Sequence, residues 1–88
     1  MTVSPHDRLA ATNRLRRALL AFQSAQILVL THQRQHKAPS QAEMETLRDS
    51  AAEVVTAFQA FSAAGLVTGT DDQRLVAQAQ RYLAEGAA

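Results

Sequence analysis

The residues with the clearest capacity for chemistry are two histidines four positions apart, His32 and His36. This spacing places both side chains on one face of a helix, where two imidazoles can share a transition metal if a third ligand completes the site. Glu43 or Met44, a short way along the chain, is the candidate third ligand. His32, His36 and Glu43 therefore form a metal- or haem-binding alternative. The plainer interpretation is that cationic histidines favour the C-terminal end of a helix.

A second group of residues that could bind a ligand is a basic cluster near the N-terminus, which consists of Arg8, Arg14, Arg16 and Arg17. Phosphate contacts from such a cluster give nucleic-acid affinity without sequence preference. The chain has only one tyrosine and three phenylalanines, which offers little stacking surface for single strands. On a helix the arginines also point in different directions. We expect them to pair with acidic residues of this chain or of a partner subunit, and nucleic-acid binding is the alternative.

The sequence carries no pattern typical of an enzyme, and we expect neither catalysis nor a bound cofactor. The absence of cysteine excludes disulfides, thiolate metal sites and cysteine nucleophiles. The three glycines do not form a phosphate-binding loop. Asp71 and Asp72 are better explained as charges in the first turn of a helix than as a catalytic pair.

The elements that would position these residues are all helical. Helix-start and helix-stop residues and the spacing of apolar residues predict three helices, over about residues 5–36, 41–64 and 71–85. No segment shows the alternation of apolar and polar residues that is typical of a strand. Thr70 is the expected cap of the third helix. The fold class is therefore all-α, with a long antiparallel helical hairpin and a shorter third helix in one domain over residues 1–88.

Capping residues support the first two helices. Ser4 followed by Pro5 is typical of a helix start, because the proline has no N–H to leave unpaired. Ser40 with Glu43 three residues later is a capping box. Gly65 favours a left-handed ending of the second helix.

Apolar residues recur at spacings of three and four and predict which helix faces are buried. The first helix has one such stripe, which consists of Ala11, Leu15, Ala18, Phe22, Ala25 and Val29. The second helix has a matching stripe of Met44, Leu47, Ala51, Val54, Phe58 and Phe61. The third helix carries a shorter apolar side, with Leu75, Val76, Ala79, Tyr82 and Leu83. The two long stripes predict an antiparallel hairpin.

The first helix has a further apolar face. Leu9, Leu20 and Ile27 project about 170° away from its first stripe. A third helix of only about 15 residues covers part of this face at most. We therefore expect a homodimer in which this helix packs against its mate; the alternative is a monomer in which the third helix covers everything. The expected interface residues are Leu9, Arg16, Leu20, Ile27 and Leu28.

The amino-acid composition is consistent with a protein that associates with itself or with other proteins. The chain has 88 residues and a net charge of +1, and alanine supplies 18 of its hydrophobic residues. Its core is therefore thin for a monomer. No apolar run fits a signal peptide or a membrane span, so we expect a cytoplasmic protein, and the excess of arginine over lysine suggests a bacterial or phage origin. We expect a non-enzymatic protein–protein interaction module (an adaptor, regulator, inhibitor or assembly factor) that binds its own copy and an unidentified protein.

Overall fold

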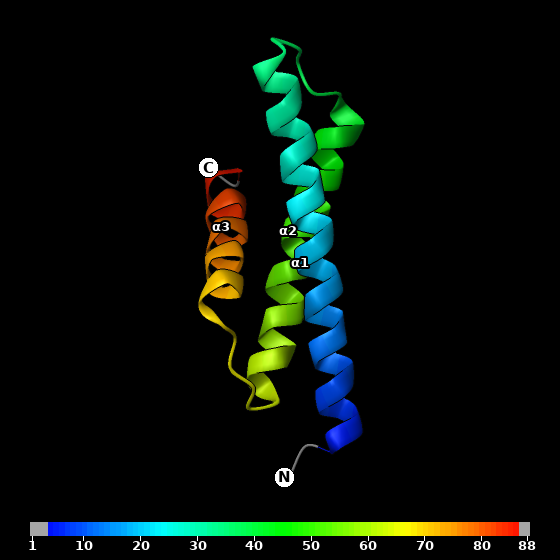
Figure 1. The fold of residues 1–88 in the computed structure, drawn as a ribbon, viewed down its shortest axis with the longest axis vertical. Coiled ribbons are helices and arrows are strands. Elements are labelled where there is room, and N and C mark those ends of the chain that lie inside the picture. The colour runs from blue at the N-terminus through cyan, green and yellow to red at the C-terminus, as the bar shows by residue number, and fades with distance from the viewer. Residues whose placement is uncertain (1–3, 87–88) are drawn as a thin grey trace.

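The computed structural model describes residues 4–86 and contains three helices joined by two short connections. They are α1 (Pro5–Arg34), α2 (Gln41–Ala63) and α3 (Thr70–Gly86). Figure 1 shows α1 and α2 running side by side as a long hairpin, with α3 next to it. No strand occurs within residues 4–86. The all-α prediction is confirmed, and each helix boundary lies within two residues of its predicted position.

The predicted N-caps of α1 and α2 are present. The Ser4 hydroxyl accepts a hydrogen bond of 3.1 Å from the Asp7 backbone N–H, and the Ser40 hydroxyl accepts one of 3.1 Å from the Glu43 N–H. Only half of the predicted capping box forms, because the Glu43 carboxylate faces His32 instead of turning back to its own helix start. Glu43 thus donates its backbone N–H to the Ser40 cap of α2, while its side chain contacts α1.

A Schellman motif ends α2, as its sequence predicts. Gly65 has a positive φ of 78°, and its N–H donates to the Ser62 carbonyl at 2.9 Å. The Leu66 N–H donates to the Phe61 carbonyl at 3.3 Å. These two bonds satisfy carbonyls that the helix end would otherwise leave unpaired.

The start of α3 differs slightly from the prediction. Thr70 lies within the first turn and does not act as the cap, because the Gly69 carbonyl already accepts the Gln73 N–H at 2.9 Å. The two first-turn acids Asp71 and Asp72 remain at the positive end of the helix dipole, as expected.

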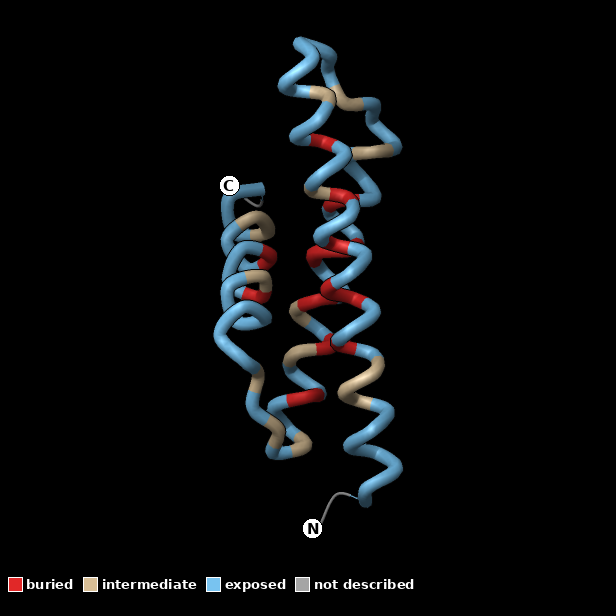
Figure 2. The backbone as a smooth tube through the Cα atoms, viewed as in Figure 1, coloured by how far each residue is buried: buried red, intermediate tan, exposed pale blue. Residues whose placement is uncertain are grey.

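The core lies along the seam between α1 and α2. Figure 2 shows the buried residues concentrated where the helices face one another. On α1 the buried side chains are Leu15, Ala18, Leu19, Phe22, Ala25 and Val29. On α2 they are Leu47, Ser50, Ala51, Val54, Ala57 and Phe61. Both predicted stripes are therefore confirmed in their central parts.

Departures from the predicted stripes occur near their ends. Ala11 and Phe58 are half-buried, and Met44 is exposed. The buried Ser50 was not predicted; its hydroxyl donates to the Leu47 carbonyl at 2.9 Å, which satisfies its polar group.

The third helix packs chiefly against α2 and only lightly against α1. It buries Val76 and Ala79 against the hairpin, and a hydrogen bond of 3.2 Å between the Gln26 and Gln78 side chains links it to α1. In Figure 1 the hairpin extends well beyond the C-terminal end of α3. The third helix therefore covers one side of the hairpin over part of its length.

The resulting molecule is long and has a large surface for its mass. Its principal extents are 51 × 24 × 23 Å and its radius of gyration is 14.4 Å, whereas a compact domain of this length has a radius of gyration of about 12 Å. The chain exposes 6248 Å². A compact monomer of 9.5 kDa exposes about 5000 Å².

Phe22 is the largest side chain with no exposed surface, so its truncation tests the seam. We expect Phe22→Ala to lower the free energy of unfolding by about 3–5 kcal/mol, because a cavity remains between two helices that cannot close over it. Urea unfolding followed by circular dichroism measures the change. The control Gln59→Ala, at an exposed position of α2, changes the stability by less than about 0.5 kcal/mol. Equal effects of both substitutions would contradict the assigned core.

Candidate functional site

The most prominent surface feature is an apolar line along the side of α1 that faces away from α2. Leu9, Leu20 and Ile27 are 59%, 58% and 57% exposed, and at 100° per residue they project within about 20° of one another. Arg16 lies on the same side, about 40° or less from each of them. We call these four residues the outer face of α1. The α3 helix leaves this face exposed, as the prediction of incomplete cover requires.

Leu28 belongs to a different side of α1. It projects about 100° away from Ile27 and lines a shallow groove of about 150 Å³ between α1 and α2. Thr46 contributes to the α2 wall of that groove. Leu28 is 46% exposed, but the structure does not bring it into line with the other predicted interface residues.

A groove of about 210 Å³ borders the outer face on the side of α3. Arg16 and Leu20 line its α1 wall, and Val67 and Leu75 are among the residues opposite. Val67 lies in the connection between α2 and α3 and is 85% exposed. The sequence analysis did not predict that Val67 lines this groove, because helical periodicity does not apply to a residue in a loop. The only sign in the sequence was a large apolar residue that belongs to no helix face.

A wider groove, of about 590 Å³, lies where the hairpin extends past α3. Met44 and Arg48 from the start of α2 line one side, and Tyr82 and Leu83 from the end of α3 line the other. Leu83 and Tyr82 were predicted to pack on the hairpin and are half-buried here. The groove marks the point at which the core loses its third helix.

The predicted basic cluster is divided between two roles. The Arg14 Nε lies 2.7 Å from Glu53 Oε1, and a second guanidinium nitrogen donates to Oε2 at 3.4 Å. This pair joins α1 to α2 and is a contact of the predicted kind, between one of these arginines and an acidic residue of the same chain. Within residues 4–86, Arg8, Arg16 and Arg17 form no ion pair. They project in three directions separated by about 80–100°, so the structure gives no continuous basic surface.

The Arg14–Glu53 contact shifts both groups in the directions expected of an ion pair. The hydrogen bond from Arg14, with a smaller direct charge attraction, lowers the pKa of the Glu53 carboxyl. The hydrogen bond to Glu53, again with charge attraction, raises the pKa of Arg14. Both side chains are about half exposed, so solvent screens the contact and its contribution to stability is small.

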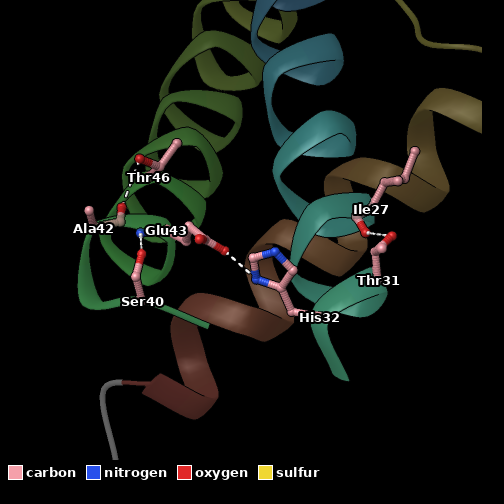
Figure 3. Close-up of polar contacts among 7 residues, drawn as sticks. All are labelled: Ile27, Thr31, His32, Ser40, Ala42, Glu43 and Thr46. Atoms are coloured by element: carbon pink, nitrogen blue, oxygen red, sulfur yellow. Dashed lines mark hydrogen bonds and ion pairs between the residues drawn. The ribbon is translucent and has the colours of Figure 1, made fainter. Parts of the chain in front are cut away.

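The structure brings together two of the three predicted metal ligands. His32 Nδ1 lies 2.8 Å from Glu43 Oε2, and Figure 3 shows the two side chains facing each other between α1 and the start of α2. Both atoms are shielded from solvent, yet the contact lacks the alignment of a good hydrogen bond. It is a close electrostatic contact that depends on a proton on the imidazole. Nowhere in residues 4–86 do three His, Asp or Glu side chains gather closely enough to hold a metal ion.

His36 is separated from that pair because the helix has already ended. The residue adopts a positive φ of 57°. Its N–H donates to the Gln33 carbonyl at 3.1 Å, and the Lys37 N–H donates to the His32 carbonyl at 2.8 Å. These bonds form a second Schellman ending, with His36 in the position that glycine usually occupies. The expectation that His36 shares a helix face with His32 is therefore wrong.

Comparison with known proteins yields no relative. No protein-family model matches the chain, and no curated protein or solved structure is significantly similar to it. Among the described helices, none has a stretch long and apolar enough to cross a membrane.

The outer face of α1 is the candidate functional site because it is the largest aligned set of exposed apolar side chains on one helix.

The Arg14–Glu53 pair makes stability depend on pH in the acid range. Because the folded pKa of Glu53 is lowered, its stabilisation is complete above the ordinary value of 4.5 and is lost as the pH falls through the lowered folded value. We expect Arg14→Gln to raise the Glu53 pKa towards 4.5. Carboxyl titration by NMR measures it. An unchanged Glu53 pKa in the variant would show that the pair does not form in solution.

Replacing His36 with glycine should stabilise the protein. An L-residue pays a conformational cost in the left-handed region that glycine does not, and this gain outweighs the greater freedom of glycine in the unfolded chain. We expect His36→Gly to raise the free energy of unfolding by about 0.5–1 kcal/mol. Thermal unfolding tests this, with His36→Ala as the matched control that gains nothing. Destabilisation by His36→Gly would mean that the imidazole itself makes a needed contact.

Proposed function

We propose that this chain is a protein–protein interaction module that works through the outer face of α1. The observation that carries the proposal is the alignment of Leu9, Leu20 and Ile27, each more than half exposed, opposite a face that is already buried against α2. Isolated exposed apolar residues are common on protein surfaces. An aligned set on one helix is typical of a surface that another helix covers.

The amount of exposed surface supports the same conclusion. The chain exposes 6248 Å², an excess of about 1200 Å² over a compact monomer of its mass. A protein–protein interface of standard size removes about 800 Å² from each partner. One interface of this size per chain would therefore remove about two thirds of the excess.

The composition of the core gives a reason why association would matter. Alanine occupies many of the buried positions, namely Ala18, Ala25, Ala51, Ala57 and Ala79. Alanines allow close helix approach but bury little apolar area, and domains this small commonly gain stability by oligomerisation. Roles as an adaptor, regulator, inhibitor or assembly factor in the cytoplasm are all compatible with such a module. The nucleic-acid alternative is less well supported, because Glu53 already engages Arg14.

Site-specific photocrosslinking in the cells that make the protein tests the proposal. We expect a photoreactive phenylalanine analogue at position 20 to give a protein adduct, since Leu20 lies at the centre of the outer face. The matched control places the same analogue at Thr56, an exposed position of α2, and gives none. Adducts are detected on denaturing gels and identified by mass spectrometry. No adduct at position 20, or equal adducts at both positions, would contradict the proposed face.

A further inference from the structure

The proposal that follows rests on the proposed function, since it names what covers the central part of the outer face, around Leu20 and Ile27. We propose that the occupant is a second copy of this chain, whose α1 packs antiparallel to the first about a two-fold axis near Gln23 and Ser24. The argument uses the positions of apolar residues along α1, the placement of its charges and the area that is left to bury.

Two of the three apolar residues of the outer face, Leu20 and Ile27, are placed symmetrically about that axis. Leu20 and Ile27 each lie about 5 Å from it along the helix, on opposite sides. An antiparallel pairing therefore brings Leu20 level with the partner subunit's Ile27, and the same contact repeats on the other side of the axis. The two side chains also point in nearly the same direction around the helix, within about 20° of each other. Two apolar contacts then form from one self-complementary patch, as a two-fold interface requires.

The charges decide between the antiparallel and the parallel arrangement. Arg16 and Arg34 project in the same direction on α1, and no acidic residue lies on this side of the helix between them. A parallel pairing would place each arginine level with its own copy and bring like charges together. The antiparallel pairing instead places Arg16 level with the partner subunit's Thr31, and Arg34 level with the partner subunit's Asn13. The like charges are then no longer directly level, because Arg16 is offset from the partner subunit's Arg34 by three residues, about 4.5 Å along the helix.

The rest of the fold leaves room for this partner. The third helix packs chiefly on α2, so it does not obstruct the outer face. Figure 3 shows Ile27 and Thr31 on the side of α1 opposite His32, which faces α2. Val67 borders the face through the groove beside Leu20 and extends the apolar area towards a partner. The excess of about 1200 Å² over a compact monomer exceeds the roughly 800 Å² per chain that a standard interface buries.

Position 31 provides a test of both the partner and its direction. Thr31 is exposed, and its hydroxyl donates only to the Ile27 carbonyl of its own helix at 2.8 Å. We expect Thr31→Glu to lower the dimer dissociation constant about three- to tenfold relative to Thr31→Gln, because two new Arg16–Glu pairs form across the interface. Thr31→Lys raises the constant by a similar factor. Analytical ultracentrifugation over a dilution series measures all three variants.

Two further variants make the result specific. The double variant Arg16→Glu with Thr31→Lys regains the affinity that Thr31→Lys alone lowers, since each new glutamate meets a new lysine. Thr56→Glu, on the exposed side of α2, leaves the dissociation constant unchanged. Circular dichroism confirms that every variant keeps its helices. High salt reduces the gain of Thr31→Glu.

The outcomes separate this inference from the proposed function. A dimer that is strengthened by Thr31→Glu supports the antiparallel pairing. A dimer that is weakened by it overturns the orientation, because glutamates then face each other. A chain that stays monomeric at all concentrations, but crosslinks another protein through position 20, overturns the self-association and leaves the interaction face standing. A monomer without adducts overturns both.

Discussion

The close seam between α1 and α2 is the constraint on which the rest of this molecule depends. Alanines on both helices allow the backbones to approach, and Phe22 and Val54 fill the space that remains without exposing any surface. Such a seam fixes the rotation of each helix about its own axis, because turning either helix would move Phe22 or Val54 out of the space that it fills. The rotation of α1 also determines the direction in which its outer face points. Arg14 and Glu53 then meet at the edge of the seam as a result of that rotation.

The third helix acts within limits imposed by this arrangement. It has 17 residues against 30 in α1, so it covers a part of the hairpin and leaves two surfaces open: the outer face of α1 and the groove beyond its own C-terminal end. Its amphipathic character gives it one buried side, and α2 takes most of the contact. The exposed leucines and isoleucine of α1 are therefore a consequence of helix lengths and rotation together, and no single residue accounts for them.

Local and periodic features of this fold could be predicted from sequence, whereas features that depend on where two elements meet could not. Ser4, Ser40 and Gly65 act on the backbone of their immediate neighbours, so their residue types suffice to place the helix ends. The repeat of three and four residues likewise suffices for the central seam. The contact of Glu43 with His32 depends on how the hairpin closes. The left-handed His36 could not be foreseen, because few residues other than glycine take that conformation.

The part of the hairpin that extends beyond α3 has a further consequence for how the protein moves. Around residues 30–45 only two helices support each other, Leu30 and Met44 are partly open to water, and the main polar link is the single contact between His32 and Glu43. Few buried contacts mean a low free energy for local opening. Backbone amides near this end are therefore expected to exchange with solvent deuterium well before those around Phe22. The molecule would then behave as a firm middle section with one end that opens and recloses while the remainder stays folded.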